Sequence, residues 1–236
     1  MGDLMGKLKE IIENILPYER DLFLLLNGSD SVFLDDIMWV ISKTAVWFLF
    51  YGFVALFLFY KTQKKDAALV LFFFILMVVL CDQVSSGLMK PFFERLRPAH
   101  HPDFKDFVDT VNGYRGGGFS FISGHATNSF GFAVFLSLVF RHRWVTLVAL
   151  VWAMSIGYSR VYLGVHFISD VAGGVLAGTL IALFAYAILA AVRKKFVQPT
   201  DAPESMRIYP PQHGKLLALI FTAYFIGVVL LGLLFP

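Results

Sequence analysis

Residues 67–89 read AALVLFFFILMVVLCDQVSSGLM, and Asp82 is the only charged side chain in this stretch. A helix of this length, rising 1.5 Å per residue, crosses the roughly 30 Å hydrocarbon core of a bilayer. The rest of the chain has a matching composition, because 58% of the 236 residues are hydrophobic and only 16% are charged. These values predict an all-α, polytopic membrane helical bundle forming one domain over residues 1–236.

Apolar length and flanking charge predict about six transmembrane helices, of which the third and fourth are the shortest. The predicted spans are 38–60, 67–89, 124–140, 144–158, 167–192 and 216–235. Residues 1–36 lack such a run. Residues 3–16 instead place apolar and charged side chains on opposite faces at the helical period, which predicts an amphipathic helix lying at the membrane interface. A second short helix at the apolar stretch 22–26 is expected to be interfacial as well.

Basic clusters occupy alternate connections of this bundle, at 61–65, 141–143 and 193–195. The positive-inside rule places all three on the cytoplasmic side. The connections from Lys90 to Ser123 and from Arg160 to His166 then face outward, together with the N-terminal interfacial helix. We expect an integral protein of the inner or plasma membrane with these two connections on its extracytoplasmic face.

Charge and cysteine content argue against several other classes of protein. The net charge is only +3, and the basic residues stand beside apolar runs, a pattern typical of membrane topology and not of nucleic-acid binding. The single cysteine, Cys81, can form neither an intrachain disulfide nor a cysteine metal site. We expect no nucleic-acid partner, no cofactor and no metal; His100 and His101 are adjacent and lack an evident third ligand.

Polar side chains concentrate at the outward ends of the predicted spans, in three stretches that together make up a catalytic region at 90–170. The stretches are 90–98 (KPFFERLRP), 120–125 (SFISGH), and Ser159-Arg160 followed by His166 and Asp170. They supply cations, N–H donors at the start of the third span, and two histidines, which are the groups that phosphoryl transfer needs. On a helix, the spacing from His166 to Asp170 would place the carboxylate one turn from the imidazole.

The spacing of these residues resembles the three-part signature of the type 2 phosphatidic acid phosphatase superfamily, the lipid phosphate phosphatases. The matched residues are Lys90, Arg97-Pro98, Ser123-Gly124-His125, Ser159-Arg160, His166 and Asp170. One position departs from the pattern. The family's second motif usually begins with proline, and this chain has Ile122 there, which puts the rigidity of the turn in doubt more than the chemistry.

The resemblance implies a role for each matched residue. Lys90, Arg97, Ser123, Gly124 and Arg160 would bind the phosphate. His166 would attack phosphorus to give a phosphohistidine, with Asp170 orienting its ring. His125 would protonate the leaving oxygen and then activate water.

These observations predict a metal-independent phosphatase that cleaves a lipid phosphomonoester or pyrophosphate. The resemblance alone favours undecaprenyl pyrophosphate, with phosphatidylglycerol phosphate, phosphatidic acid and lipid A as further candidates. An alternative is an anion or lipid transporter that uses the same basic cluster. Charges gathered at one face, without repeat symmetry, argue against transport.

Overall fold

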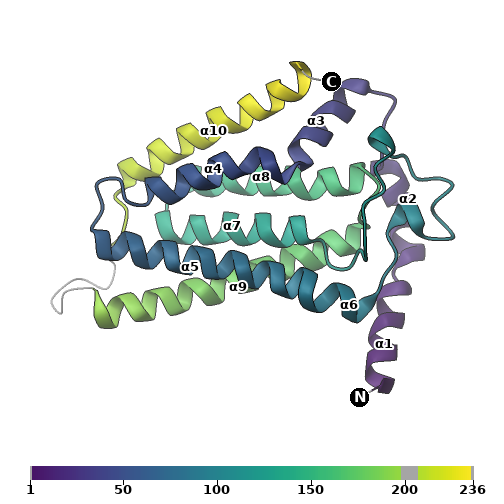
Figure 1. Cartoon of the computed structure of the whole chain (residues 1–236), viewed down its shortest axis with the longest axis horizontal. Helices are drawn as coiled ribbons and strands as arrows, with labels where there is room; N and C mark the ends of the chain where they lie inside the picture. The colour runs from purple at the N-terminus through teal and green to yellow at the C-terminus, as the bar shows by residue number, and fades with distance from the viewer. Residues whose placement is uncertain (1, 198–206, 235–236) are drawn as a thin grey trace.

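The computed structural model describes residues 2–197 and 207–234, and every regular element within these ranges is helical (Figure 1). A π-helical turn, η1 (Gln83–Met89), joins the fifth and sixth helices. The helices are α1 (Gly2–Glu13), α2 (Leu16–Leu26), α3 (Val32–Ser42), α4 (Thr44–Phe57), α5 (Lys64–Asp82), α6 (Lys90–Phe93), α7 (Gly124–Phe140), α8 (Arg143–Tyr162), α9 (Ile168–Phe196) and α10 (Pro211–Leu234).

The predicted all-α membrane class is confirmed. Four segments of the described chain are long and apolar enough to cross a bilayer: Lys64–His100, Arg143–Tyr162, Ile168–Phe196 and Pro211–Leu233. The helices α3 and α4 make a fifth candidate span, bent by 49°, and α7 is a shorter apolar helix of 17 residues. All six predicted apolar segments are therefore helical, although they do not all have the length of a simple span.

The first predicted span, 38–60, is not one continuous helix. Lys43 has an extended backbone (φ −72°, ψ 112°), so that α3 ends before it and α4 begins after it. The hydroxyl groups on either side of this break, those of Ser42 and Thr44, contact Arg160 and His125. Sequence periodicity could not reveal the break, because its polar contacts come from α7 and α8.

The fourth predicted span, 144–158, is shorter than the helix found in the structure. The helix α8 continues to Tyr162 and has 20 residues, so it is not among the shortest, and Arg160 lies in its last turn instead of in the following loop. The prediction ended the helix where polar residues begin. Arg160 is 3% exposed and has polar partners inside the bundle, which lets the helix continue through it.

The helices α7 and α9 pack closely at the centre of the bundle because glycines face the contact. A Cβ atom added to Gly174 would lie 2.7 Å from the carbonyl oxygen of Ser123, and one on Gly178 would clash with that of Thr127. Small residues four apart allow such close backbone approach between membrane helices. The approach also brings the Ser123 N–H within 3.0 Å of the Asp170 carbonyl oxygen, joining the starts of the two helices.

Large apolar side chains cover the outer faces of the long helices, as expected for contact with lipid. Examples are Phe48, Leu49, Leu56, Phe72, Ile75, Leu176, Leu180, Phe184, Leu219 and Leu230. The helices α1 and α2 instead run across one end of the bundle (Figure 1). This crosswise placement agrees with an interfacial position, which stays a prediction.

Candidate active site

The end of the bundle that α1 and α2 cross contains α6, the start of α7, the end of α8 and the start of α9 (Figure 1). All eight residues predicted to form the site lie on these elements or in the loops beside them: Lys90, Arg97, Ser123, Gly124, His125, Arg160, His166 and Asp170. The fold therefore brings the three stretches of the sequence pattern to one place.

His166 lies in the loop between α8 and α9 and is only 2% exposed. Its Nε2 is 3.3 Å from Nη1 of Arg97, and its Nδ1 is 3.4 Å from Oδ2 of Asp170 without completing a hydrogen bond. An arginine can only donate, so Nε2 is the acceptor and the ring proton resides on Nδ1, facing the carboxylate. This tautomer leaves the Nε2 lone pair beside the guanidinium of Arg97.

Burial holds the pKa of His166 well below its ordinary value, and the positive charges of Arg97, Arg160 and Lys90 lower it further. The imidazole is therefore neutral at physiological pH. A neutral imidazole whose Nε2 is unprotonated is a competent nucleophile. The same three cations would attract a phosphate dianion to the place that Nε2 faces.

The side chains of Arg97 and Arg160 are buried against neutral oxygen atoms. Arg97 donates from Nε to the Gly117 carbonyl at 3.0 Å and from Nη1 to the Val165 carbonyl at 2.9 Å. Arg160 donates to the Ser42 hydroxyl, and its Nε has no hydrogen-bond partner in the part of the chain that the structure describes. Within the described residues, neither guanidinium has a carboxylate within salt-bridge distance, so both retain charge for an anionic ligand.

The start of α7 has the expected form. Ser123 is its N-cap, and its hydroxyl accepts a hydrogen bond from the Ala126 N–H at 3.4 Å. A Cβ atom on Gly124 would lie 3.8 Å from Nζ of Lys90, so the lysine ammonium lies beside the helix N-terminus. His125 follows directly, with its Nε2 3.2 Å from the Thr44 hydroxyl.

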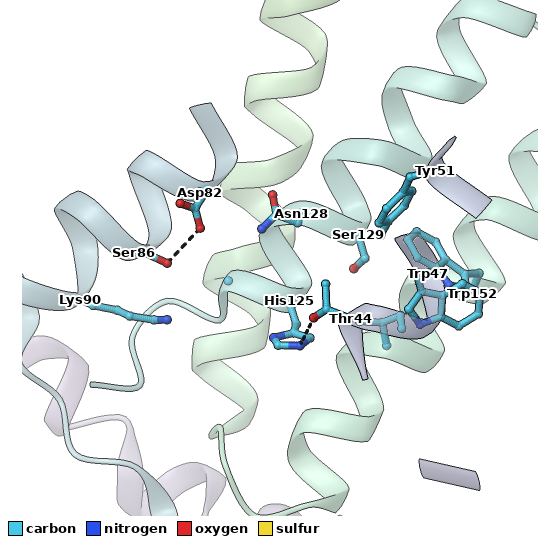
Figure 2. Close-up of a pocket in the computed structure, with 12 residues that line it drawn as sticks. Thr44, Trp47, Tyr51, Asp82, Ser86, Lys90, His125, Asn128, Ser129 and Trp152 are labelled. Atoms are coloured by element: carbon cyan, nitrogen blue, oxygen red, sulfur yellow. Dashed lines mark hydrogen bonds between the residues drawn. The ribbon is translucent and has the colours of Figure 1, made fainter. Parts of the chain in front are cut away.

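A cavity of about 280 Å³ adjoins His125 inside the bundle. Figure 2 shows Lys90, Ser86 and Asp82 on one side of this space and His125 with Asn128 of α7 on the other. Asp82 accepts a hydrogen bond from the Ser86 hydroxyl at 3.3 Å. The cavity therefore combines a cation, a histidine and several hydrogen-bonding side chains.

The expected helical relation between His166 and Asp170 is wrong in detail. The helix α9 begins at Ile168, so His166 precedes it and Asp170 occupies its first turn. The carboxylate reaches the imidazole because it caps the helix: Oδ2 of Asp170 accepts from the Phe167 N–H at 2.8 Å. The side chains still meet, through a cap and not through one helical turn.

Several polar neighbours of the site were missed from the sequence. Arg95 is 2% exposed and donates to Asp170 at 2.6 Å, and Glu19 of α2 bonds to the same arginine at 3.1 Å. Ser42 and Thr44 meet the site at the break between α3 and α4. The sequence offered one signal for Arg95, because it is a third basic residue in the segment from Lys90 to Arg97. It offered none for Glu19, Ser42 and Thr44, because their contacts with the site depend on the tertiary structure.

Ile122, which stands where the family pattern has proline, is buried at 2% exposure. It packs against α9, since a Cβ atom on Gly173 would lie 2.7 Å from its Cγ2. The side chain thus fixes the turn before α7 by packing. Among the described residues no three His, Cys, Asp or Glu side chains are grouped as metal ligands.

The model of the PAP2 superfamily matches residues 71–194, which include all eight predicted site residues. The chain belongs to this family. It is 40% identical to a lipid A 4'-phosphatase from Porphyromonas gingivalis over 88% of both chains. A lipid A 4'-phosphatase from Bacteroides thetaiotaomicron is 35% identical over 71% of this chain and 75% of the relative.

A solved structure has the same fold: a transmembrane PAP2-type phosphatidylglycerolphosphate phosphatase from Bacillus subtilis. It aligns with a TM-score of 0.59 and 23% identity, covering 84% of this chain and 95% of that chain. The predicted family, the predicted enzyme class and the integral membrane location are thereby confirmed, and the chain is a lipid phosphatase. The transporter alternative has no support from these relatives.

Proposed function

We propose that this lipid phosphatase removes a phosphate from a lipid A-type glycolipid, with its site at the extracytoplasmic face of the membrane. Two relatives at 40% and 35% identity are lipid A 4'-phosphatases, and both alignments cover most of this chain. An undecaprenyl-diphosphatase from Sulfolobus acidocaldarius is more distant, at 28% identity. These values favour lipid A over undecaprenyl pyrophosphate, the substrate that the family resemblance alone favours.

The observation that carries the proposed mechanism is the position of His166 between Arg97 and Asp170. Arg97, Arg160 and Lys90 would hold the three non-bridging oxygens of the phosphate, with the Ser123 hydroxyl and the Gly124 N–H as further donors. Nε2 of His166 would then attack phosphorus, forming an N–P bond as the P–O bond to the lipid breaks. Asp170 would stabilise the positive charge that develops on the imidazole.

The second histidine, His125, would serve as the general acid. It lies at the N-terminus of α7 beside the cavity, where a leaving alcohol can be placed. After giving its proton to the leaving oxygen, it would take one from water. The resulting attack on phosphorus would break the N–P bond and release inorganic phosphate.

The cavity beside His125 supports a leaving group that carries hydroxyl or amide groups. Its lining includes the Asp82 carboxylate, the Asn128 amide and the hydroxyls of Ser86 and Thr44, and within the described residues Oδ1 of Asn128 has no hydrogen-bond partner. The hydroxyl and amide groups of a sugar can satisfy such side chains. This chemistry agrees with a phosphorylated sugar lipid.

Purified protein in detergent should be assayed against lipid A, phosphatidylglycerol phosphate, phosphatidic acid and undecaprenyl pyrophosphate at equal concentrations. We expect the highest kcat/KM with lipid A, and mass spectrometry of the product identifies which phosphate was lost. Activity should persist in a chelator, because the three fixed cations supply the charge that a metal would provide. Higher kcat/KM with undecaprenyl pyrophosphate would overturn the proposed substrate.

The proposed orientation is tested separately with a reporter inserted in the connection between Lys90 and Ser123. A reporter active only outside the cytoplasm should be active at this position. A matched insertion at residues 61–65, at the opposite end of the bundle, should be inactive. The reverse pattern would place the site on the cytoplasmic side.

A further inference from the structure

We infer that Arg95, held in place by Glu19 of the N-terminal helix α2, is a positioning residue that sets the orientation of Asp170 toward His166. This inference deepens the proposed function, because it concerns the same nucleophile. It assigns the segment 1–36 a part in catalysis beyond membrane attachment. Neither residue is among those that the family signature marks.

Arg95 makes its strongest contact with Asp170. Nη1 of Arg95 is 2.6 Å from Oδ1 of Asp170, and both side chains are fully enclosed, with 1% and 0% of their area exposed. The other carboxylate oxygen, Oδ2, accepts from the Phe167 N–H at 2.8 Å and faces Nδ1 of His166. Two fixed donors therefore determine which way the carboxylate plane points.

The guanidinium of Arg95 is itself fixed from the side of α2. Its Nη2 lies 3.1 Å from Oε1 of Glu19, and its Nη1 also donates to the Ser169 hydroxyl at 2.7 Å. Glu19 is 7% exposed and accepts from both the Ser169 hydroxyl at 2.6 Å and the Ser169 N–H at 2.7 Å. The face of Arg95 packs over the Phe167 ring at 4.6 Å.

These contacts form a closed polar cluster that connects α2 to the first turn of α9. A buried guanidinium between two buried carboxylates has little freedom, because both of its Nη atoms already donate to them, although its Nε makes no hydrogen bond within the described residues. The distance between Oδ2 of Asp170 and Nδ1 of His166 is 3.4 Å, which is long for a hydrogen bond. Hydrogen bonds between catalytic groups often shorten only when substrate binds. A carboxylate that is already oriented can make this bond by a small movement.

Arg95 differs in this respect from Arg97, two residues later. Arg97 donates to carbonyl oxygens and to His166, so its charge remains available to the phosphate. The charge of Arg95 is instead neutralised by carboxylates. It therefore acts on the reaction through Asp170 and not through the substrate.

The test compares Arg95→Lys and Glu19→Gln with Glu13→Gln as the matched control. Glu13 also approaches Arg95, at 3.7 Å from its Nε, but its side chain is 42% exposed and it does not reach Asp170. We expect kcat to fall about tenfold in each of the first two variants, with KM within about twofold of the wild type, because the phosphate ligands are untouched. Glu13→Gln should leave both constants unchanged.

Arg95→Met should lower kcat on the order of 10²-fold, because Asp170 then loses its anchor. If this variant does not fold, Glu19→Gln decides, since it keeps the shape of the side chain. The proposal is overturned if folded Arg95→Lys and Glu19→Gln keep the wild-type kcat, or if Glu13→Gln loses as much activity as they do.

A second readout does not depend on the substrate. Ring ¹⁵N chemical shifts of His166 in detergent micelles should report the Nδ1–H tautomer in the wild type and in Glu13→Gln. Arg95→Lys and Glu19→Gln should keep this tautomer, because Arg97 still faces Nε2, but should shift the Nδ1 resonance as the contact with Asp170 weakens. An unchanged Nδ1 shift would overturn the proposal. If the wild type released no phosphate from any lipid phosphate, the proposed function would fail, while these shifts would still decide the role of Arg95.

Discussion

The buried arginines at the two ends of the helical bundle have different partners, except that Arg95 is paired with carboxylates at the end that α1 and α2 cross. At the end crossed by α1 and α2, Arg97 and Arg160 contact carbonyl and hydroxyl oxygens and, among the described residues, no carboxylate. At the other end, Arg193 of α9 is paired with Asp66 of α5, with 2.8 Å between Nε and Oδ1. Each of these arginines is buried, so burial alone does not distinguish the two ends.

The difference lies in whether the positive charge is neutralised within the protein. A buried cation is costly unless a counter-charge accompanies it. The Arg193–Asp66 pair supplies that charge internally and connects two helices. Among the described residues, Arg97 and Arg160 have no such counter-charge, and we expect a phosphate dianion to supply it when substrate binds.

The largest effect should come from His166→Ala, which removes the proposed nucleophile. We expect kcat for phosphate release to fall on the order of 10⁴-fold or more, as for other essential nucleophiles. Acid-stable and acid-labile phosphate should be separated after a single turnover, because only the wild type should form the acid-labile phosphohistidine. An active His166→Ala protein would exclude this histidine as the nucleophile.

The second prediction concerns the arginines without carboxylate partners. Arg160→Lys should lower kcat/KM by about 10²-fold, because lysine keeps the charge but loses the planar fork that fits phosphate oxygens. Arg193→Lys at the opposite end is the matched control and should change kcat/KM less than about twofold. Equal losses of kcat/KM in the two variants would show that Arg160 matters no more to the reaction than the carboxylate-paired Arg193.

A smaller effect is expected on the pH dependence. His166 must be neutral to attack, and its lowered pKa keeps it neutral below the ordinary histidine value of about 6.5. The acidic limb of the pH profile of kcat/KM should therefore have its midpoint below about pH 6.5. Arg97→Gln removes a cation that disfavours the imidazolium, so the pKa of His166 should rise and the limb should move to higher pH. A limb that stays in place, measured with the same substrate, would contradict this assignment.

The smallest effect on turnover should come from Asp66→Asn. This change leaves Arg193 without its carboxylate and should lower the free energy of unfolding by about 3 kcal/mol. Thermal denaturation in detergent measures this loss. The folded fraction should keep its kcat within about twofold, because the pair lies at the end remote from His166. A large loss of kcat would show that the two ends are coupled.

Much of the fold and site could be predicted from local patterns. The apolar run at 67–89 and its counterparts predicted the helical membrane class, because hydrophobic length depends only on the sequence. The start of α7 was predicted at Gly124, with Ser123 before it, and the structure has Ser123 as the N-cap. The candidate site residues were found by their spacing, and the fold brings them to one end.

Tertiary structure alone decided how those residues are held. The break at Lys43 and the extension of α8 through Arg160 depend on partners from other elements, whereas the cap made by Asp170 is local and only the contact of this carboxylate with Arg95 is tertiary. The cluster of Arg95 and Glu19 joins positions 76 residues apart, which no local period can connect. The physical reason is that apolar length and helix-start signals are properties of neighbouring residues, whereas the cost of burying a charge depends on what the folded chain places beside it.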